Sequence, residues 1–408
     1  MAVKTEAPTR VAGVRPFTIE IPEAEIDALR ARIRATRWPE KQTVDDQSQG
    51  VPLQTSQALA RYWEQEYDWR KVEARLNALP NFITEIDGLD IHFIHVRSKH
   101  EDALPLIVTH GWPGSVIEQL KIVGPLTDPT AHGADASDAF HLVIPSMPGY
   151  GFSGKPTTPG WGPERIARAW IELMKRLRYT RFVAQGGDWG ALVTDLIGLQ
   201  TPPELLGIHT NMPGTVPPDI DKLIQSDITG LNQALGSLPA NLSDEEKRAC
   251  EQMDFFWKHG AYALMMGTRP ETLTGLADSP IALASFMLDH DAASLELICG
   301  AFAGQPGGLT RDDILDNITL FWLTNTGVSA ARLYAENKFS FLAAKGVTVP
   351  AAVSVFPDEL YQAPRSWAER AYPNLIHYNR LDRGGHFAAW EQPQLLSEEL
   401  RVGFRPLR

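Results

Sequence analysis

The sequence predicts an α/β fold with a mostly parallel, doubly wound sheet, and two observations lead to this prediction. From residue 104 onward, short and continuous apolar runs alternate with segments of helical periodicity. Continuous hydrophobicity is typical of parallel strands that helices cover on both faces. Between two of these runs, residues 163–179 place Ile166, Trp170 and Leu173 on one face of a helix. Strand and helix in repeated alternation favour a doubly wound sheet.

The candidate strands end where a long helical stretch begins and resume after it. Between about residues 215 and 335 the strand signal disappears, and Ser243 followed by Glu246 has the spacing of a capping box at a helix start. We expect this helical insertion to form a cap over the carboxyl ends of the strands, where ligands bind in such sheets. The five candidate strands are residues 104–110, 140–146, 181–186, 347–356 and 374–379.

The first part of the chain has a different pattern. Residues 21–40 and 56–69 each carry an apolar stripe at helical spacing. Residues 81–96 alternate apolar and polar side chains on both sides of Asp87 and Gly88, which predicts a β-hairpin. The chain is therefore expected to contain an N-terminal meander (1–95), a first core part (96–215), a helical cap (216–338) and a second core part (339–408).

The bulk properties are those of an ordinary globular protein. The 408 residues are 43% hydrophobic and 22% charged, and the net charge of −12 disfavours a surface that binds nucleic acid or anionic membranes. The two cysteines, Cys250 and Cys299, have no CxxC spacing, so we expect both to be reduced. The start lacks the apolar region of a signal peptide, and no apolar run is long enough to span a membrane. We expect a cytoplasmic protein without a membrane anchor.

The chemistry is expected to centre on residues 185–191, which read Gln-Gly-Gly-Asp-Trp-Gly-Ala after an apolar run. Glycines frame Asp188 as they frame the serine in the sharp strand-to-helix turn that presents a nucleophile. Asp188 could instead be a simple helix N-cap, but an N-cap does not require glycines on both sides. An aspartate is already ionised at pH 7. It can therefore attack saturated carbon and form an alkyl ester with its substrate.

Cleavage of that ester needs a general base and an oxyanion hole. His386 follows two glycines directly after the last predicted strand, and it is the expected base. The backbone N–H groups of Trp112 and Trp189 are expected to form the oxyanion hole. We interpret His110, in the same loop as Trp112, as a residue that stabilises the turn.

Three acids are candidates to orient His386, and spacing alone does not separate them: Asp358, Glu359 and Asp382. Metal chemistry is not expected, because no HExxH pair occurs. Nucleotide chemistry is not expected either, because residues 149–154 are glycine-rich but lack the βαβ context of a dinucleotide site. The expected reaction therefore needs no cofactor.

Five motifs occur in order along the chain and carry a resemblance to a known family. They are HGWPGS (110–115), PSMPGYGFSGKP (145–156), GGDWG (186–190), FPDE (356–359) and GGHFAAWEQP (384–393). With these motifs the sequence resembles the epoxide hydrolases of the α/β-hydrolase fold over nearly its whole length. RPFTIEIP and TRWPE near the start are similar to the N-terminal meander of the microsomal-type branch, which includes juvenile-hormone enzymes.

The resemblance implies a role for each matching residue. Asp188 corresponds to the nucleophile, His386 to the base, and Glu359 rather than Asp358 to the acid that orients it. Segments of the expected cap are similar to those that supply two tyrosines to the epoxide oxygen, which implies Tyr262 and Tyr334. The family hydrolyses epoxides to vicinal diols. Mammalian microsomal members carry a hydrophobic N-terminal anchor, and we expect none in this protein.

The substrate is expected to be a small hydrophobic epoxide, held in an apolar pocket between cap and sheet. A haloalkane dehalogenase with the same aspartate nucleophile is an alternative, and so is a non-catalytic protein that binds an apolar ligand. The sequence also leaves open a homodimer formed through the cap or the N-terminal arm. The side chains expected to line the pocket are Trp112, Phe152, Trp189 and Trp390.

Overall fold

The centre of the molecule is a nine-stranded sheet in the computed structural model, which describes residues 13–226, 234–305 and 307–408. The strand order is β1-β2-β3-β5-β4-β6-β7-β8-β9. Strands from β5 to β9 in this order are parallel, and β1, β2 and β3 form an antiparallel edge. The predicted mostly parallel α/β sheet is therefore confirmed. The strands are β1 (Val14–Pro16), β2 (Asn81–Ile86), β3 (Leu89–Val96), β4 (Leu104–Thr109), β5 (Phe140–Pro145), β6 (Phe182–Gly186), β7 (Leu205–Thr210), β8 (Ala351–Val355) and β9 (Leu375–Arg380).

Each of the five predicted runs contains a strand, and the predicted hairpin is formed by β2 and β3. Asp87 and Gly88 both have positive φ, as the tight two-residue hairpin turn requires. The sequence prediction omitted β7, in which Gly207 and His209 interrupt the apolar run. His209 is nevertheless buried, and its Nε2 forms a 2.9 Å hydrogen bond with Ser354 Oγ on β8. A tertiary partner thus makes a polar residue compatible with a central strand.

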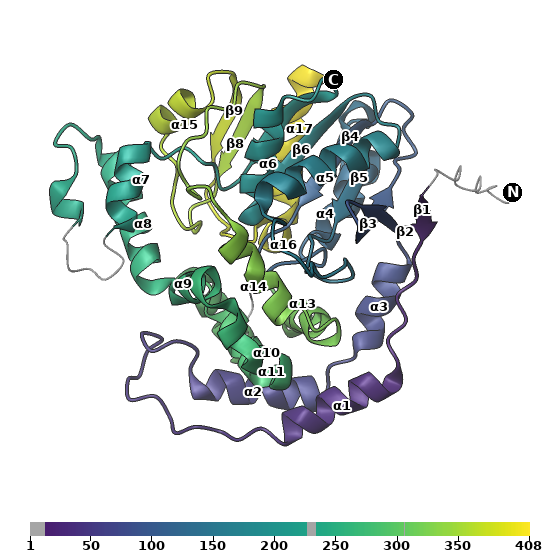
Figure 1. Cartoon of the computed structure of the whole chain (residues 1–408), viewed down its shortest axis with the longest axis vertical. Helices are drawn as coiled ribbons and strands as arrows, with labels where there is room; N and C mark the ends of the chain where they lie inside the picture. The colour runs from purple at the N-terminus through teal and green to yellow at the C-terminus, as the bar shows by residue number, and fades with distance from the viewer. Residues whose placement is uncertain (1–12, 227–233, 306) are drawn as a thin grey trace, which may run out of the picture.

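Helices of the core cover the sheet on both faces (Figure 1). Helix α5 packs against α6, and α4 packs against α16 and α17. The helix predicted in residues 163–179 is α5, which buries the predicted stripe. The core helices are α4 (Leu120–Thr127), α5 (Pro163–Arg176), α6 (Trp189–Gln200), α15 (Arg365–Ala371), α16 (Ala388–Glu391) and α17 (Pro393–Phe404), with short 3₁₀ turns at Pro129–His132, Ala136–Asp138 and Arg405–Leu407.

The stretch between β7 and β8 is helical, as predicted, and the capping box of Ser243 and Glu246 is formed at the start of α8. The boundaries of the four predicted parts remain predictions. Figure 1 shows the labelled helices α9, α10, α11, α13 and α14 of this stretch between the sheet and the N-terminal helices. The helices of this stretch are α7 (Pro218–Gln225), α8 (Asp244–His259), α9 (Ala261–Thr268), α10 (Gly275–Asp278), α11 (Pro280–Leu288), α12 (Ala292–Phe302), α13 (Arg311–Leu323) and α14 (Gly327–Glu336), with 3₁₀ turns at Ala234–Ser237 and Pro270–Thr274.

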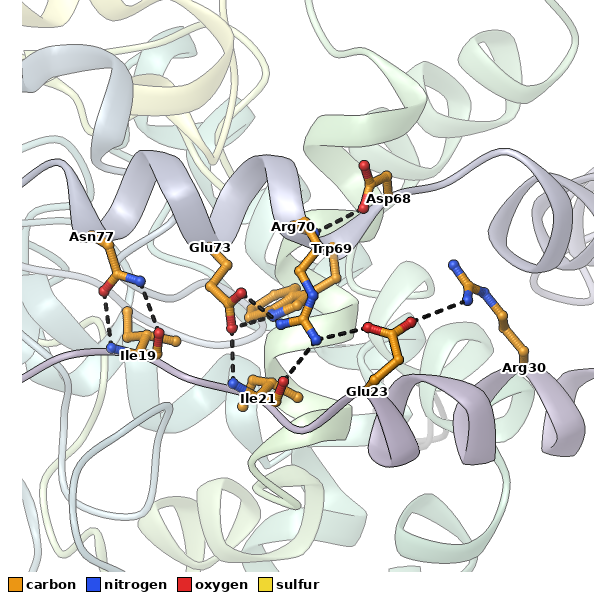
Figure 2. Close-up of polar contacts among 9 residues, drawn as sticks. All are labelled: Ile19, Ile21, Glu23, Arg30, Asp68, Trp69, Arg70, Glu73 and Asn77. Atoms are coloured by element: carbon orange, nitrogen blue, oxygen red, sulfur yellow. Dashed lines mark hydrogen bonds and ion pairs between the residues drawn. The ribbon is translucent and has the colours of Figure 1, made fainter.

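The N-terminal arm contains α1 (Glu23–Arg34), α2 (Leu53–Gln65) and α3 (Trp69–Asn77). Figure 2 shows how side chains of α3 hold the extended segment that precedes α1. The Asn77 amide bonds both the N–H and the C=O of Ile19, at 2.9 and 2.8 Å. Glu73 accepts a hydrogen bond from the N–H of Ile21 at 2.8 Å, and Arg70 donates one to the carbonyl of Ile21 at 2.8 Å. These side chains satisfy backbone groups that no neighbouring strand reaches.

The same arm holds helix α13, which also contacts the loop after β4. Trp63 Nε1 donates to Thr319 Oγ1 at 2.9 Å, and Tyr67 donates to Asp316 at 2.8 Å. Because these hydrogen bonds are buried, they fix α13 relative to α2 and the start of α3. Within the described residues, no helix combines the length and the apolar composition that crossing a bilayer requires.

Candidate active site

Asp188 lies at the sharp turn between β6 and α6, with φ 49° and ψ −128°. A non-glycine residue with positive φ is strained, so the surrounding turn must hold it there. The flanking glycines allow the close contacts that do so. A Cβ on Gly186 would lie 2.0 Å from the Gly190 carbonyl oxygen, and one on Gly190 would lie 1.9 Å from that of Thr109. The turn therefore presents the carboxylate of Asp188 at the end of β6.

Two backbone amides hold this carboxylate, and both were predicted to form the oxyanion hole. The N–H of Trp112 donates to Asp188 Oδ1 at 2.6 Å, and the N–H of Trp189 also hydrogen-bonds to Asp188. Burial raises the pKa of Asp188, while His386, His290 and the two amides oppose that rise. Amides that bind the resting carboxylate are also in position to bind an oxyanion on the same carbon.

The loop that carries Trp112 is held from two sides. On one side, Asn317 of α13 donates to the carbonyl of Pro113 at 2.7 Å and accepts from Ser115 Oγ at 2.7 Å. On the other, His110 Nε2 accepts from the N–H of Met147 at 3.2 Å. Burial lowers the pKa of His110 to about 4, so this ring is neutral and supports the loop.

His386 follows β9, and Glu359 follows β8. His386 Nδ1 lies 2.6 Å from Glu359 Oε1, and its Nε2 lies 3.6 Å from Asp188 Oδ2. Burial lowers the pKa of His386, but the nearby carboxylates of Glu359, Asp188 and Asp291 raise it, with a net increase to about 10. The structure thus brings the carboxylate of Asp188 and the His386–Glu359 pair together.

Of the three acids that spacing left open, only Glu359 reaches the histidine. Asp358 pairs through its backbone with Gly385, and the side chain of Asp382 is 79% exposed. In the turn after β8 it is Glu359 whose carboxylate oxygen lies at hydrogen-bond distance from the His386 ring.

Tyr262 of α9 is buried and Tyr334 of α14 is half-buried, and both pack against the residues that surround Asp188. The Tyr262 ring stacks on Trp112 with ring centroids 4.8 Å apart, and the Tyr334 ring meets Trp189 edge-on at 4.6 Å. The two tyrosine rings are 6.2 Å apart. Burial, together with the charge of Asp188, raises the pKa of both phenols well above the usual value. Both phenols are therefore protonated donors at neutral pH.

The other two predicted lining residues lie differently. The Phe152 ring packs against Phe17 and His92, at 5.5 and 5.2 Å. Trp390 packs edge-on against Phe387, the residue after His386. A role in lining the pocket stays a prediction for Phe152 and Trp390.

Sequence reasoning missed a second histidine in the site. His290 lies between α11 and α12, and its ring is 4.4 Å from that of His386 and 5.1 Å from that of Tyr262. Its Nδ1 is 2.9 Å from Asp291 Oδ2. Burial raises the pKa of Asp291, but the hydrogen bond to His290 and other contacts lower it to about 2. The adjacent His-Asp pair was the available signal, although an Asp at a helix start usually indicates only an N-cap.

A small polar cavity beside Asp188 and His386 was also missed. It encloses about 20 Å³, and Glu118, Gln119 and Gln185 contribute to its lining. Gln119 Nε2 donates to Glu118 Oε1 at 2.5 Å, and burial raises the pKa of Glu118 to about 8. Within the described residues, the side-chain oxygens of both glutamines and Nε2 of His386 have no hydrogen-bond partner. A cavity of this size and polarity accommodates one water molecule.

Comparison with known proteins places this geometry in a family. Residues 14–119 match the family model for the epoxide hydrolase N terminus, and residues 105–247 match that for the alpha/beta hydrolase fold. Epoxide hydrolase 1 of Oryctolagus cuniculus is 36% identical, over 95% of this chain and 88% of its own. A relative from Stigmatella aurantiaca, provisionally named an epoxide hydrolase, is 50% identical over 97% of this chain and 86% of its own.

Solved structures agree with these matches. The crystal structure of juvenile hormone epoxide hydrolase from the silkworm Bombyx mori superposes with a TM-score of 0.84 at 29% identity, over 97% of this chain and 95% of that chain. The Aspergillus niger epoxide hydrolase superposes with a TM-score of 0.80 at 30% identity, over 98% and 97% of the two chains. The chain therefore belongs to the epoxide hydrolases of the α/β-hydrolase fold and is an enzyme of that family.

Proposed function

We propose that the enzyme hydrolyses a small hydrophobic epoxide to a vicinal diol without a cofactor, through an alkyl ester on Asp188. The observation that carries this proposal is the grouping around one buried carboxylate: two protonated phenols from the cap and an imidazole paired with Glu359. A nucleophile, two acids for the leaving oxygen and a base for water are the parts that such a reaction needs.

In the first step, a carboxylate oxygen of Asp188 attacks a ring carbon, and the carbon–oxygen bond of the epoxide breaks. The developing alkoxide takes a proton from Tyr262 or Tyr334, and the imidazolium of His386 restores that proton. Before the attack, the imidazolium favours the ionised form of Asp188, because its positive charge opposes the effect of burial on that pKa. The products of this step are a neutral ester, a new hydroxyl group and a neutral imidazole.

In the second step, His386 takes a proton from water, and the hydroxide attacks the carboxyl carbon of Asp188. The imidazole has given up its proton in the first step, and esterification has removed the charge of Asp188, which is one of the charges that favour its protonated form, so it can act as the base. The amides of Trp112 and Trp189 stabilise the tetrahedral oxyanion. The diol oxygen leaves with the proton from His386, and the proton of the new carboxyl group returns to the imidazole.

Isotope labelling in a single turnover tests this route. With enzyme in excess over styrene oxide in ¹⁸O-water, the first diol is expected to carry an unlabelled oxygen from Asp188, and the label should enter the protein. Acid hydrolysis of the same epoxide is the control, because it places one ¹⁸O atom from water in each diol molecule beside the oxygen of the epoxide. One ¹⁸O atom per diol in the first enzymatic turnover would rule out the ester. A bromoalkane assayed in parallel tests the dehalogenase alternative.

The small polar cavity is a suitable place for the water of the second step. It contacts both Asp188 and His386, and the unpaired oxygens of Gln119 and Gln185 can accept hydrogen bonds from water. Glu118 is protonated at neutral pH because of its raised pKa, so it can donate to the water without placing a charge there. We infer that Glu118 positions this water molecule.

The leucine substitution Glu118→Leu is expected to lower kcat about tenfold through slower ester hydrolysis, because the water loses one of its partners. Glu118→Gln should retain most of the activity, since an amide has nearly the shape of a protonated carboxyl group. Rapid quenching followed by protein mass spectrometry measures the fraction of enzyme held as ester, which should rise only in the leucine variant. An equal loss in both variants, or an unchanged ester fraction, would contradict the inferred role.

A further inference from the structure

We propose that the active-site pocket contains an inhibitory binding site for a divalent transition-metal ion, represented by Zn²⁺, with Asp188, His290 and His386 as ligands. The existence of the site is independent of the reaction. Only the claim of inhibition rests on the proposed function, because the metal would occupy the nucleophile and the base.

The three side chains are close enough to share one ion. One possible ligand atom from each lies within 4.8 Å of the others, and His386 Nε2 is 3.6 Å from Asp188 Oδ2. Tetrahedral zinc with bonds of about 2.0–2.1 Å places its ligand atoms roughly 3.3 Å apart. The catalytic pair is thus near that separation already, and His290 on the α11–α12 connection needs only a small approach.

Both histidines have an unused ring nitrogen. Within the described residues, Nε2 of His290 and Nε2 of His386 are buried and without a hydrogen-bond partner. Each opposite ring nitrogen is held by a carboxylate, at 2.9 Å for Asp291 and 2.6 Å for Glu359. With Nδ1 hydrogen-bonded to a carboxylate, each ring can bind metal through Nε2 once the ion displaces any proton on that atom, which is the usual arrangement behind metal-bound histidines.

The charge and the chemistry of the ligands select the kind of ion. Asp188, Glu359 and Asp291 bring three carboxyl groups into one buried cluster, which a divalent cation would neutralise in part. Two imidazoles and one carboxylate suit Zn²⁺ and similar transition metals, whereas Mg²⁺ and Ca²⁺ prefer oxygen ligands. Three protein ligands leave a fourth position for solvent.

Metal binding would have two consequences. It would block turnover in competition with the epoxide, because Asp188 and His386 would both be coordinated. It would also link the α11–α12 connection to the catalytic loops of the core, since His290 comes from the former and the other two ligands from the latter. An ion that binds only the folded protein raises its melting temperature.

The experiment uses the full chain after dialysis against a chelator, with Zn²⁺ for calorimetry and inhibition and Co²⁺ for absorption spectroscopy. We expect one ion per chain, a rise in Tm, competitive inhibition that a chelator reverses, and Co²⁺ bands typical of four-coordination with nitrogen ligands. His290→Gln should weaken Zn²⁺ binding at least tenfold, and His290→Phe, which keeps an aromatic ring, should do the same. The control is His259→Gln, an exposed histidine on α8, which should bind Zn²⁺ like the wild type.

The outcomes separate the two proposals. Absence of binding, or binding that neither His290 variant weakens, would overturn the metal site. Weaker binding in His259→Gln would assign the metal to the surface and would overturn it as well. If Co²⁺ binds through His290 but no epoxide is hydrolysed by the metal-free enzyme, the metal site stands and the proposed function fails. If the epoxide is hydrolysed and no metal binds, the reverse holds.

Discussion

The His386→Asn variant is expected to alkylate itself once and then stop, with kcat lower by about 10³-fold. The imidazole is the group that would take the proton from water, and its Nε2 lies 3.6 Å from the carboxylate that would carry the ester. Asparagine keeps a polar side chain of similar length but is not a base at neutral pH. The first step would still proceed, because Asp188 and the two phenols remain in place.

Mass spectrometry of the quenched variant checks this result. After digestion with trypsin, the added mass of the epoxide should appear on the peptide of residues 182–222, which contains Asp188. Asp188→Ala is the control, because it lacks the nucleophile and should give no adduct on that peptide. A His386→Asn enzyme that remains unmodified after exposure to a substrate of the wild type would show that Asp188 is not alkylated.

The double variant Tyr262→Phe/Tyr334→Phe is expected to lose at least about 10³-fold in kcat/KM, and each single variant about 10²-fold or less. Both phenols are protonated, so either one can still stabilise the alkoxide when the other is removed. Removal of both leaves the alkoxide without a phenolic proton donor. Phenylalanine keeps the ring contacts with Trp112 and Trp189, so packing should change little.

Stopped-flow kinetics of one turnover distinguish a chemical role from a structural one. The rate of ester formation should fall in the double variant, while hydrolysis of preformed ester should change much less. The matched control is Tyr378→Phe on β9. This change removes a hydroxyl that donates to the carbonyl of Ala363, and it should leave both rates near those of the wild type. Equal losses in the two steps would indicate a general distortion of the site.

Much of the fold could be predicted because its signals are local. Continuous apolar runs indicated β4, β5, β6, β8 and β9, since strands covered on both faces have no polar side to show. The positive φ of Asp188 and the close contact between Gly186 and Gly190 involve only neighbouring residues, so the turn that carries Asp188 was visible in the sequence. Strand β7 was not visible in the sequence, because the burial of its His209 depends on a hydrogen-bond partner on β8.

The composition of the site depended on contacts between distant segments. Asp358 and Glu359 are indistinguishable by spacing, and only the direction of each side chain decides which one meets His386. His290 and Glu118 looked like an ordinary helix flank and an ordinary loop acid until packing buried both beside Asp188. By itself the sequence determined most of the sheet, the turn that carries Asp188 and the family, because local backbone and burial requirements are written into neighbouring residues. The tertiary structure decided that Glu359 rather than Asp358 meets His386 and that His290 and Glu118 lie beside Asp188, since these distant segments meet only when the chain has folded.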